Sequence, residues 1–378
     1  MKNIVYLDNS ATTKPCDLSI QYMNNALTEN WGNPSSLHTI GINAEDLIIS
    51  AKETCAKTIG ARSDEIYFTS GGTEANNLAI RGAVQSRAKR GNRIVTTEIE
   101  HPSVLEVMKN LEQKGFEVIY LKPDENGVVA HNSLKDAINK NTILVSIMLV
   151  NNEIGTIQPV LEAANIIKEV GAPALLHCDA VQAFGKIGIK VNELGVDLLS
   201  FSGHKIHAPK GIGVLYKKKG VTISPIIFGG GQQDALRPGT EAVPLICALE
   251  GAILSLPNIK ASYDKMQQLC DYAKDKLKST KIVEFNSPQN ALPYILNISV
   301  VGYRSETLLH FLDAKGIFVS SGSACSKGKL SHTLSALKLD SKRIDSALRI
   351  SFSRENSFED IDKLCDALLE ASKKLKRA

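Results

Sequence analysis

The 378-residue chain has the composition of a globular protein, because 43% of its residues are hydrophobic and 22% are charged. Its net charge of +4 is small for this length and aromatic residues make up only 5%, so we expect no direct nucleic-acid binding. No apolar run is long enough to span a bilayer, and the N-terminus lacks the apolar stretch of a signal peptide. We therefore expect no membrane association. Seven cysteines without paired spacing indicate free thiols in a reducing cytoplasm.

Short apolar runs alternate with amphipathic stretches through the first 200 residues. The pattern predicts strands over 66–69, 93–97, 116–121, 143–150, 174–178 and 196–199, and helices over 73–87, 103–113, 134–138 and 159–170. Strands that are apolar throughout are typical of a parallel sheet buried on both faces. The sequence therefore predicts an α/β fold.

The pattern changes after Pro257. A long polar helix is predicted over 259–278, followed by strands over 295–300, 318–320 and 348–352 and by helices over 306–314 and 358–376. We therefore expect a domain boundary near Pro257 and a smaller α+β domain after it.

A glycine pair separates the strand predicted over 66–69 from the following helix, in the sequence Ser-Gly-Gly-Thr-Glu at 70–74. Glycines let the backbone approach a ligand closely, and the N–H groups at the start of a helix suit a phosphate. The alternative is an ordinary turn in which Thr73 caps the helix.

Two polar positions follow apolar strands. Asp179 needs a partner there, and the protonated ring nitrogen of a cofactor would serve; the alternative is a helix cap. Lys205 lies among small residues and can form a Schiff base if its pKa is lowered, whereas the alternative is a surface lysine. Ser202 and His204 would add donors for a phosphate. We expect no metal, because His204 and His207 lack cysteine or carboxylate ligands at suitable spacing.

Cys325 lies in a run of small polar residues, with Lys327 and Lys329 close behind it. The run has no apolar face and the nearby cations favour a thiolate, so an exposed, reactive thiol is expected. Four other cysteines fall in predicted helices or in an apolar strand and are expected to be packed: Cys178, Cys247, Cys270 and Cys365. Together, a lysine, an acid, a phosphate loop and a thiol indicate pyridoxal phosphate chemistry on a sulfur substrate.

Ordered motifs run along almost the whole chain, and through them the sequence resembles the cysteine desulfurases of the NifS/IscS-like branch of the class V aminotransferase family. The shared segments are Tyr-Leu-Asp-Asn-Ser-Ala-Thr-Thr at 6–13, Gly-Asn-Pro-Ser-Ser at 32–36, Thr-Ser-Gly-Gly-Thr-Glu at 69–74, Glu-His at 100–101, Val-Asn-Asn-Glu-Ile-Gly at 150–155, Asp-Ala-Val-Gln at 179–182, Ser-Gly-His-Lys at 202–205, Arg-Pro-Gly-Thr-Glu at 237–241, Ser-Gly-Ser-Ala-Cys at 321–325 and Arg-Ile-Ser-Phe at 349–352.

The resemblance implies a homodimer and a fold-type I enzyme that uses pyridoxal 5'-phosphate. Its large domain would hold a mostly parallel seven-stranded sheet between helices. The N-terminal segment would join the small domain. Residues 16–257 would then form the large cofactor-binding domain, and residues 1–15 and 258–378 the small domain, which carries the cysteine loop at 320–332.

The resemblance also implies a role for each site residue. The catalytic residues would hold the cofactor, take the sulfur and move protons: Lys205, Cys325 and His101. Asp179 would bind the ring nitrogen of the cofactor, and Gln182 would bind its phenolic oxygen. The phosphate would be bound by Gly72, Thr73, Ser202 and His204, together with Thr240 of the neighbouring subunit. The substrate carboxylate would be bound by Asn152, which also belongs to the cofactor-binding set, and by Arg349, whose planar guanidinium suits a carboxylate.

The implied reaction removes sulfur from L-cysteine, giving L-alanine and a persulfide on Cys325. The sulfur would pass to an acceptor protein, either an iron–sulfur scaffold or a sulfurtransferase that thiolates tRNA. The short segment after Cys325 and the chain end at 374–378 favour the second acceptor. Two alternatives are a class V aminotransferase or lyase without sulfur transfer, and a non-catalytic sulfur-carrier subunit.

Overall fold

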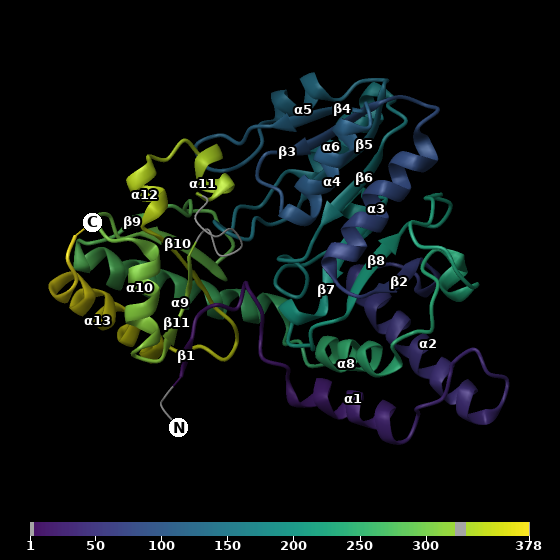
Figure 1. The fold of residues 1–378 in the computed structure, drawn as a ribbon, viewed down its shortest axis with the longest axis horizontal. Coiled ribbons are helices and arrows are strands. Elements are labelled where there is room, and N and C mark those ends of the chain that lie inside the picture. The colour runs from purple at the N-terminus through teal and green to yellow at the C-terminus, as the bar shows by residue number, and fades with distance from the viewer. Residues whose placement is uncertain (1–3, 322–329, 378) are drawn as a thin grey trace.

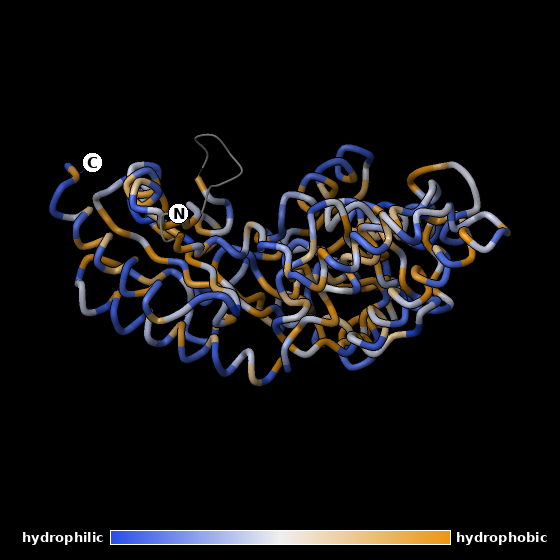
Figure 2. The backbone as a smooth tube through the Cα atoms, turned by 90° about the horizontal axis from the view of Figure 1, so that it is seen from below, coloured by the Kyte–Doolittle hydropathy of each residue, from blue (hydrophilic) through white to orange (hydrophobic). Residues whose placement is uncertain are grey.

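The computed structural model describes residues 4–321 and 330–377. Figure 1 shows a larger unit built around one broad sheet and a smaller unit that holds the last part of the chain. Figure 2 shows apolar segments running through the interior of both units.

The broad sheet of the described chain has seven strands in the order β2-β8-β7-β6-β5-β3-β4. They are β2 (Ile66–Thr69), β3 (Arg93–Thr97), β4 (Glu117–Leu121), β5 (Thr142–Met148), β6 (Leu175–Asp179), β7 (Leu198–Ser202) and β8 (Gly213–Lys217). Strand β8 runs antiparallel to β2 and β7, and the other pairs are parallel. The predicted α/β fold with a mostly parallel seven-stranded sheet is confirmed.

Helices cover both faces of this sheet. Alternate residues of a strand point to opposite faces, and in the central strands both sets are apolar and need to be buried. Val145 of β5 and Leu176 of β6 pack in one apolar cluster, and their neighbours Leu144 and Leu175 pack in another. The second cluster is covered by α3 (Gly72–Arg87) and α4 (Pro102–Gln113). The first is covered by α1 (Asp17–Thr28), α2 (Thr39–Ile59), α5 (His131–Ala137), α6 (Val160–Val170), α7 (Val191–Leu194) and α8 (Val243–Leu254).

The smaller unit is built on an antiparallel sheet in the order β12-β13-β10-β9. Its strands are β9 (Glu284–Phe285), β10 (Ile295–Ser299), β12 (Ser320–Ser321) and β13 (Ala347–Ser351). Its helices are α9 (Ile259–Thr280), α10 (Ser305–Asp313), α11 (His332–Ala336), α12 (Ser341–Asp345) and α13 (Phe358–Lys374).

The N-terminal segment lies with this smaller unit in Figure 1. Strand β1 (Val5–Tyr6) pairs in parallel with β11 (Ile317–Phe318), and Asp8 bridges to Ser351. Helix α1, by contrast, packs on α8 of the larger unit. These contacts support a chain that crosses between the units before α1, while the division at residues 15/16 and 257/258 stays a prediction.

Among the longer described elements, α1, α2 and β8 have no counterpart in the predicted ranges, and α8 was expected only as a helical segment around Cys247. Helix α8 lacks a polar stripe because it is buried nearly all round, so a helical period is hard to see. Helix α6 also begins one residue later than predicted, with Pro159 at the N-cap. No single helix of the described residues is long and apolar enough to cross a bilayer; the pair α8 and α9 reaches that length and hydropathy only together, across a 75° bend.

Candidate active site

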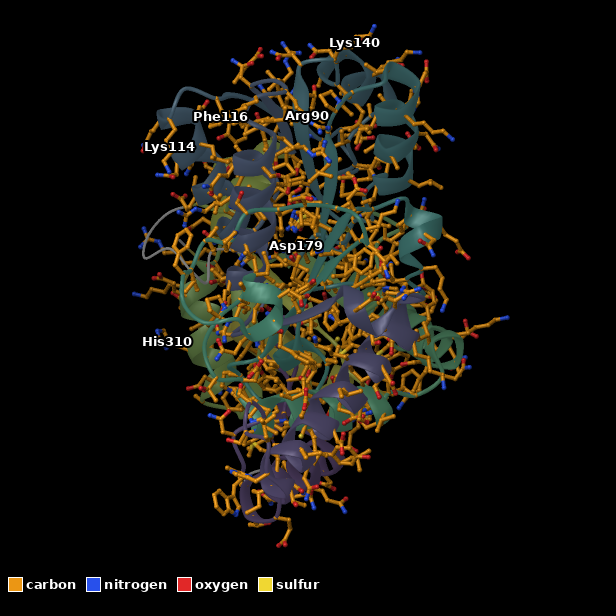
Figure 3. The ribbon with its side chains drawn as sticks, turned by 90° about the vertical axis from the view of Figure 1, so that its right-hand side faces the viewer. Arg90, Lys114, Phe116, Lys140, Asp179 and His310 are labelled. Atoms are coloured by element: carbon orange, nitrogen blue, oxygen red, sulfur yellow. The ribbon has the colours of Figure 1, made fainter. Side chains whose placement is uncertain are left out.

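A cavity of about 350 Å³ opens where the carboxyl ends of β5, β6 and β7 meet the start of α3. This is the edge at which open α/β sheets bind ligands. Asp179 is 5% exposed and lies near the middle of the view in Figure 3, whereas Lys114 and Lys140 lie near its edge. The predicted site residues that line the cavity are Gly72, Thr73, His101, Asn152, Asp179, Gln182, Ser202, His204, Lys205 and Arg349.

Two predicted site residues do not line this cavity. Thr240 is exposed elsewhere on the chain, and its expected role concerns a neighbouring subunit. Cys325 lies outside the described residues. The roles expected for both stay predictions.

The start of α3 forms one end of the cavity. The helix is capped by Gly71 rather than by Thr73, so the turn does not use the threonine cap weighed above. A Cβ atom on Gly72 would lie 2.8 Å from Cγ2 of Val181, so only glycine fits at this approach. Gly72 and Thr73 line the cavity as the first two residues of α3, where the N–H groups of a helix have no partner within the helix.

Lys205 follows β7 in a short 3₁₀ turn, Gly203–Lys205. Its Nζ donates to the carbonyl of Ser10 at 2.5 Å and to that of Ala11 at 2.8 Å. The N-terminal segment thus reaches across the sheet edge and holds the amine at the cavity wall. Burial and the charge of Lys205 lower the pKa of neighbouring His204 to about 4, so His204 is neutral at pH 7.

Asp179 ends β6 and is only 5% exposed. Its Oδ1 accepts from the N–H of Val181 at 2.9 Å, and its Oδ2 accepts from Nδ2 of Asn76 at 2.7 Å. Each carboxylate oxygen keeps further lone pairs, and the residue lines the cavity. The carboxyl group is therefore held in place beside a space that a cationic ring nitrogen would fit.

His101 caps the start of α4. Its Nδ1 accepts from the backbone N–H of Ser103 at 3.1 Å and lies 2.8 Å from that residue's Oγ. Burial lowers the pKa of His101, and the charge of Asp179 partly opposes this. The imidazole is therefore suited to accept a proton rather than to carry one permanently.

Gln182 is held at both ends of its amide. Its Nε2 donates to the carbonyl of Ser10 at 2.9 Å, and its Oε1 accepts from Nζ of Lys186 at 2.9 Å. Lys186 is buried, and burial, together with the charges of Lys205 and Arg349, lowers its pKa to about 7. Because an ammonium only donates, its protonated form directs the amide NH₂ away from Lys186, toward Ser10.

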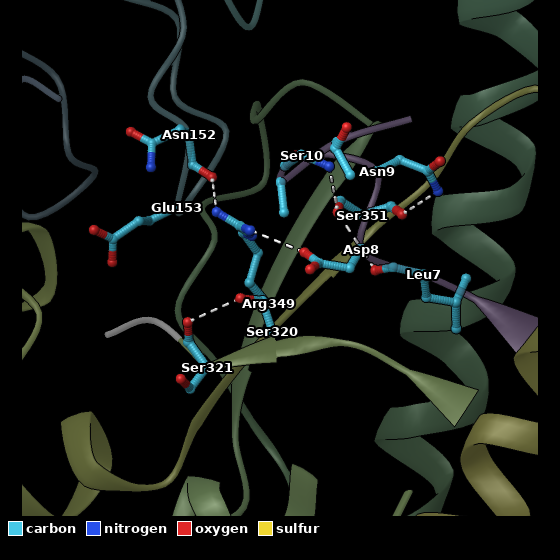
Figure 4. A network of polar contacts seen from close by, with 12 residues as sticks. Leu7, Asp8, Asn9, Ser10, Asn152, Glu153, Ser320, Ser321, Arg349 and Ser351 are labelled. Carbon is cyan, nitrogen blue, oxygen red and sulfur yellow. Dashed lines mark hydrogen bonds and ion pairs between the residues drawn. The ribbon is translucent and has the colours of Figure 1, made fainter. Parts of the chain in front are cut away.

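Arg349 comes from β13 of the smaller unit and meets two other segments, as Figure 4 shows. Its Nη2 donates to Oδ1 of Asp8 at 2.9 Å, and its Nη1 donates to the carbonyl of Asn152 at 3.1 Å. Burial raises the pKa of Asp8 even though Arg349 opposes it. Among the described residues, Nε of Arg349 is buried without a hydrogen-bond partner, which leaves a donor for an anionic ligand.

Several cavity residues were not singled out by the sequence analysis. They are Ser10, Ala11, Asn76, Ser103, Met148, Val150 and Val181. Ser10 and Ala11 lie inside a family motif quoted above. They contribute backbone carbonyls, which every residue type has, so the sequence gives no sign of this role. Asn76 offered one signal, since an amide on the apolar face of a helix needs buried partners.

Comparison with known proteins agrees with this geometry. The family model described as aminotransferase class-V matches residues 5–364. "Cysteine desulfurase IscS" of Dictyoglomus turgidum is 42% identical over 381 residues, covering 100% of this chain and 96% of that protein. Among solved structures, a "NifS-like protein" has a TM-score of 0.93 and 38% identity, with 98% of this chain and 100% of that chain covered.

A second solved structure, titled "SspA in complex with cysteine", has a TM-score of 0.82 and 34% identity over 93% of this chain and 99% of that chain. The match to the Dictyoglomus turgidum protein covers 100% of this chain, so it includes both units and every segment that lines the cavity. The chain therefore belongs to the aminotransferase class-V family and, within it, to the cysteine desulfurases related to IscS and NifS.

Proposed function

We propose that this protein uses pyridoxal 5'-phosphate to remove sulfur from L-cysteine, releasing L-alanine and leaving a persulfide on Cys325. One observation carries the proposal: an amine, a buried carboxylate and a guanidinium with a spare donor line a single cavity, as Lys205, Asp179 and Arg349. A solved relative whose title names cysteine as its ligand supports the choice of substrate.

The residues present fit this cofactor. The close approach at Gly72 and the helix start behind it form an anion cradle that a side chain would fill. Ser202 and the neutral His204 add polar groups beside it. Asp179 would hold the ring nitrogen and Gln182 would donate to the phenolic oxygen. When bound, pyridoxal phosphate supplies a conjugated ring that withdraws electrons from the substrate carbon bonded to its amine.

The remaining residues would orient the substrate and move its protons. Arg349 and Asn152 would hold the carboxylate, with the guanidinium donating two parallel bonds. Lys205 would hold the cofactor and would also take the α-proton of the substrate, because its amine lies at the wall of the same cavity. His101 would exchange a second proton through Nε2, since Nδ1 is occupied by Ser103.

Sulfur transfer would then be a nucleophilic displacement at sulfur. The Cys325 thiolate attacks the substrate sulfur, an S–S bond forms and the C–S bond breaks. The electron pair of the broken bond goes to the substrate carbon, which takes a proton to become the methyl group of alanine.

The described residues on either side of the cysteine segment support this assignment. Ser320 of β12 pairs with Arg349 of β13. On the other side, Oγ of Ser331 donates to Oε2 of Glu153 at 2.5 Å, and Glu153 follows Asn152. The described residues Ser320 and Ser331, one on each side of 322–329, therefore lie beside Arg349 and next to Asn152, which are proposed to hold the substrate carboxylate.

We further propose a homodimer in which Thr240 reaches the cofactor of the neighbouring subunit. Large apolar side chains are exposed on the larger unit, where Trp31 is 68%, Leu37 96% and Phe228 82% exposed. Exposed patches of this kind mark interfaces. The segments that carry them approach each other at a hollow lined by Pro34 and Gly231.

The acceptor and the compartment complete the proposal. We propose that the sulfur passes to a protein, either an iron–sulfur scaffold or a tRNA sulfurtransferase, in the cytoplasm. The six cysteines among the described residues are free thiols, which suits a reducing compartment. Loading Cys325 with labelled sulfur and offering each purified acceptor separately would rank the two.

Product analysis tests the proposed reaction. Incubated with L-cysteine and a thiol reductant, the holoenzyme is expected to release alanine and sulfide in equal amounts, and Lys205→Ala is expected to release neither. Lys210→Ala, an exposed lysine on the same segment, serves as the matched control. An α-keto acid in place of alanine would instead indicate an aminotransferase, and no turnover by the wild type a non-catalytic carrier.

A further inference from the structure

The hydrogen bonds behind the cavity wall form a continuous chain from Asp179 to His101. Asn76 is fully buried on α3, and its Nδ2 lies 2.7 Å from Oδ2 of Asp179 and 2.9 Å from Oγ of Ser103. Oγ of Ser103 in turn lies 2.8 Å from Nδ1 of His101. Four residues from β6, α3 and α4 are thus linked without a gap.

The donors and acceptors along this chain can be assigned from the contacts that each group makes. An ionised carboxylate only accepts, so Asn76 must turn its NH₂ group toward Asp179. The second hydrogen of that NH₂ group then points to Oγ of Ser103, which becomes an acceptor. The backbone N–H of Ser103 donates to Nδ1 of His101, which makes this nitrogen an acceptor, and the hydroxyl hydrogen of Ser103 can therefore donate to it as well.

We propose that Asn76 and Ser103 are positioning residues that hold His101 as the neutral tautomer with its proton on Nε2. Two donors meet at Nδ1, so a proton there would face them directly. Nε2 is then the ring nitrogen that exchanges a proton with a molecule in the cavity. The carboxylate that holds the ring nitrogen of the cofactor thereby also sets the state of the imidazole.

Other charged and titratable groups also act on His101. They are Asp179, Lys205, His204, His332 and Arg349. The cations among them disfavour imidazolium, and Asp179 favours it. A test must therefore separate the chain from this background of charge, which stays unchanged when an uncharged side chain such as Asn76 is replaced.

Nitrogen NMR of the holoenzyme labelled in its histidine rings tests the proposal directly. His101→Gln identifies the resonances of His101. The wild type is expected to show an unprotonated Nδ1 and a protonated Nε2 at pH 7. Asn76→Leu and Ser103→Ala are each expected to raise the pH at which His101 titrates by roughly one unit, because a donor to the neutral ring is lost or misdirected.

The double variant distinguishes a chain from two separate effects. If Asn76 acts through Ser103, Asn76→Leu adds nothing to the shift in a Ser103→Ala background. Thr96→Val is the matched control, because Thr96 is fully buried and its Oγ1 has no partner among the described residues; it should leave the titration of His101 unchanged. Should Asn76→Leu fail to fold, Ser103→Ala carries the test alone, since Ser103 is only partly buried.

A proton on Nδ1 in the wild type, unchanged titration in the variants, or additive shifts in the double variant would each overturn the proposal. The use of Nε2 in catalysis rests on the proposed function, but the NMR measurement of the tautomer does not depend on that function. If the wild type carries its proton on Nε2 but releases no sulfur from L-cysteine, only the proposed function is contradicted. If the wild type releases sulfur but carries its proton on Nδ1, only the positioning role is contradicted.

Discussion

Lys186 and Lys205 lie close together, and their surroundings give them different chemistry. Lys205 is held by two backbone carbonyls at the cavity wall. Lys186 is buried behind Gln182, facing the ring of Tyr294 at 5.8 Å. A lysine between small residues could be picked out as a candidate nucleophile from the sequence. The burial of Lys186 could not, because it depends on segments distant in the chain that close over it.

Burial of Lys186 makes a prediction about stability and pH. Its folded pKa of about 7 lies below the value of 10.5 for an unperturbed lysine. Between these values the unfolded chain binds more protons, so the free energy of unfolding rises with pH, by up to about 1.4 kcal/mol per pH unit. Lys186→Met is expected to abolish this rise. From pH 9 to pH 6, the free energy of unfolding is therefore expected to fall more in the wild type than in Lys186→Met.

Urea unfolding at a series of pH values provides the measurement. Lys168→Met is the matched control, because Lys168 is exposed on α6. In this control, the free energy of unfolding should rise with pH as it does in the wild type. If it also rose in Lys186→Met, the buried amine would not titrate between pH 7 and 10.

At the scale of elements, the strands and the helices between them could be predicted because their pattern is local. Strands β2 and β5 are buried at every position, and α3, α4 and α6 each have one apolar stripe. Helix α8 was expected only as a helical segment around Cys247, because it lacks a polar face. Strand β8 was not predicted, although it is as long as β3. The hydrogen-bond chain through Asn76 was missed too, because it joins three elements whose order in space comes only from the sheet.

The start of α3 makes a prediction about cofactor binding. Gly72→Ala would place a Cβ 2.8 Å from Val181, a short branched side chain that cannot move far. The backbone must shift away, and the N–H groups at the helix start move with it. We expect cofactor affinity to fall roughly tenfold, or about 1.4 kcal/mol.

Equilibrium binding of pyridoxal phosphate, followed by absorbance, measures this change. Gly188→Ala is the control, because a Cβ at Gly188 meets no atom within 4 Å. Wild-type affinity in Gly72→Ala would show that the close approach is unrelated to the phosphate site.

At the scale of the whole molecule, the two units are tied together at the site itself. Arg349 of the smaller unit bonds Asp8 and Asn152, and Lys205 of the larger unit bonds Ser10 and Ala11 of the N-terminal segment. Among these residues, the family motifs singled out Lys205, Asn152 and Arg349 as expected site residues. They could not predict that backbone carbonyls of the N-terminal segment would hold the lysine, since carbonyls carry no residue identity.

The exposed apolar residues make a prediction about assembly. Light scattering is expected to show a dimer for the wild type and a monomer, or a weakened dimer, for Phe228→Glu, because a charge would be buried at the interface. Leu161→Glu places the same charge on α6 at a half-exposed position and should leave the dimer intact. A monomeric wild type that binds the cofactor tightly would contradict the proposed shared site.

The central claim is that Cys325 receives the substrate sulfur, and one measurement tests it most directly. The holoenzyme is incubated with sulfur-labelled L-cysteine without reductant, digested, and its cysteine peptides are analysed by mass spectrometry. We predict one labelled sulfur atom on the peptide that contains Cys325. Cys325→Ser is expected to bind cysteine without label transfer, while Cys16→Ser, at the one described cysteine that is not buried, should label as the wild type does. Label on another cysteine, or alanine release at the wild-type rate by Cys325→Ser, would contradict the account.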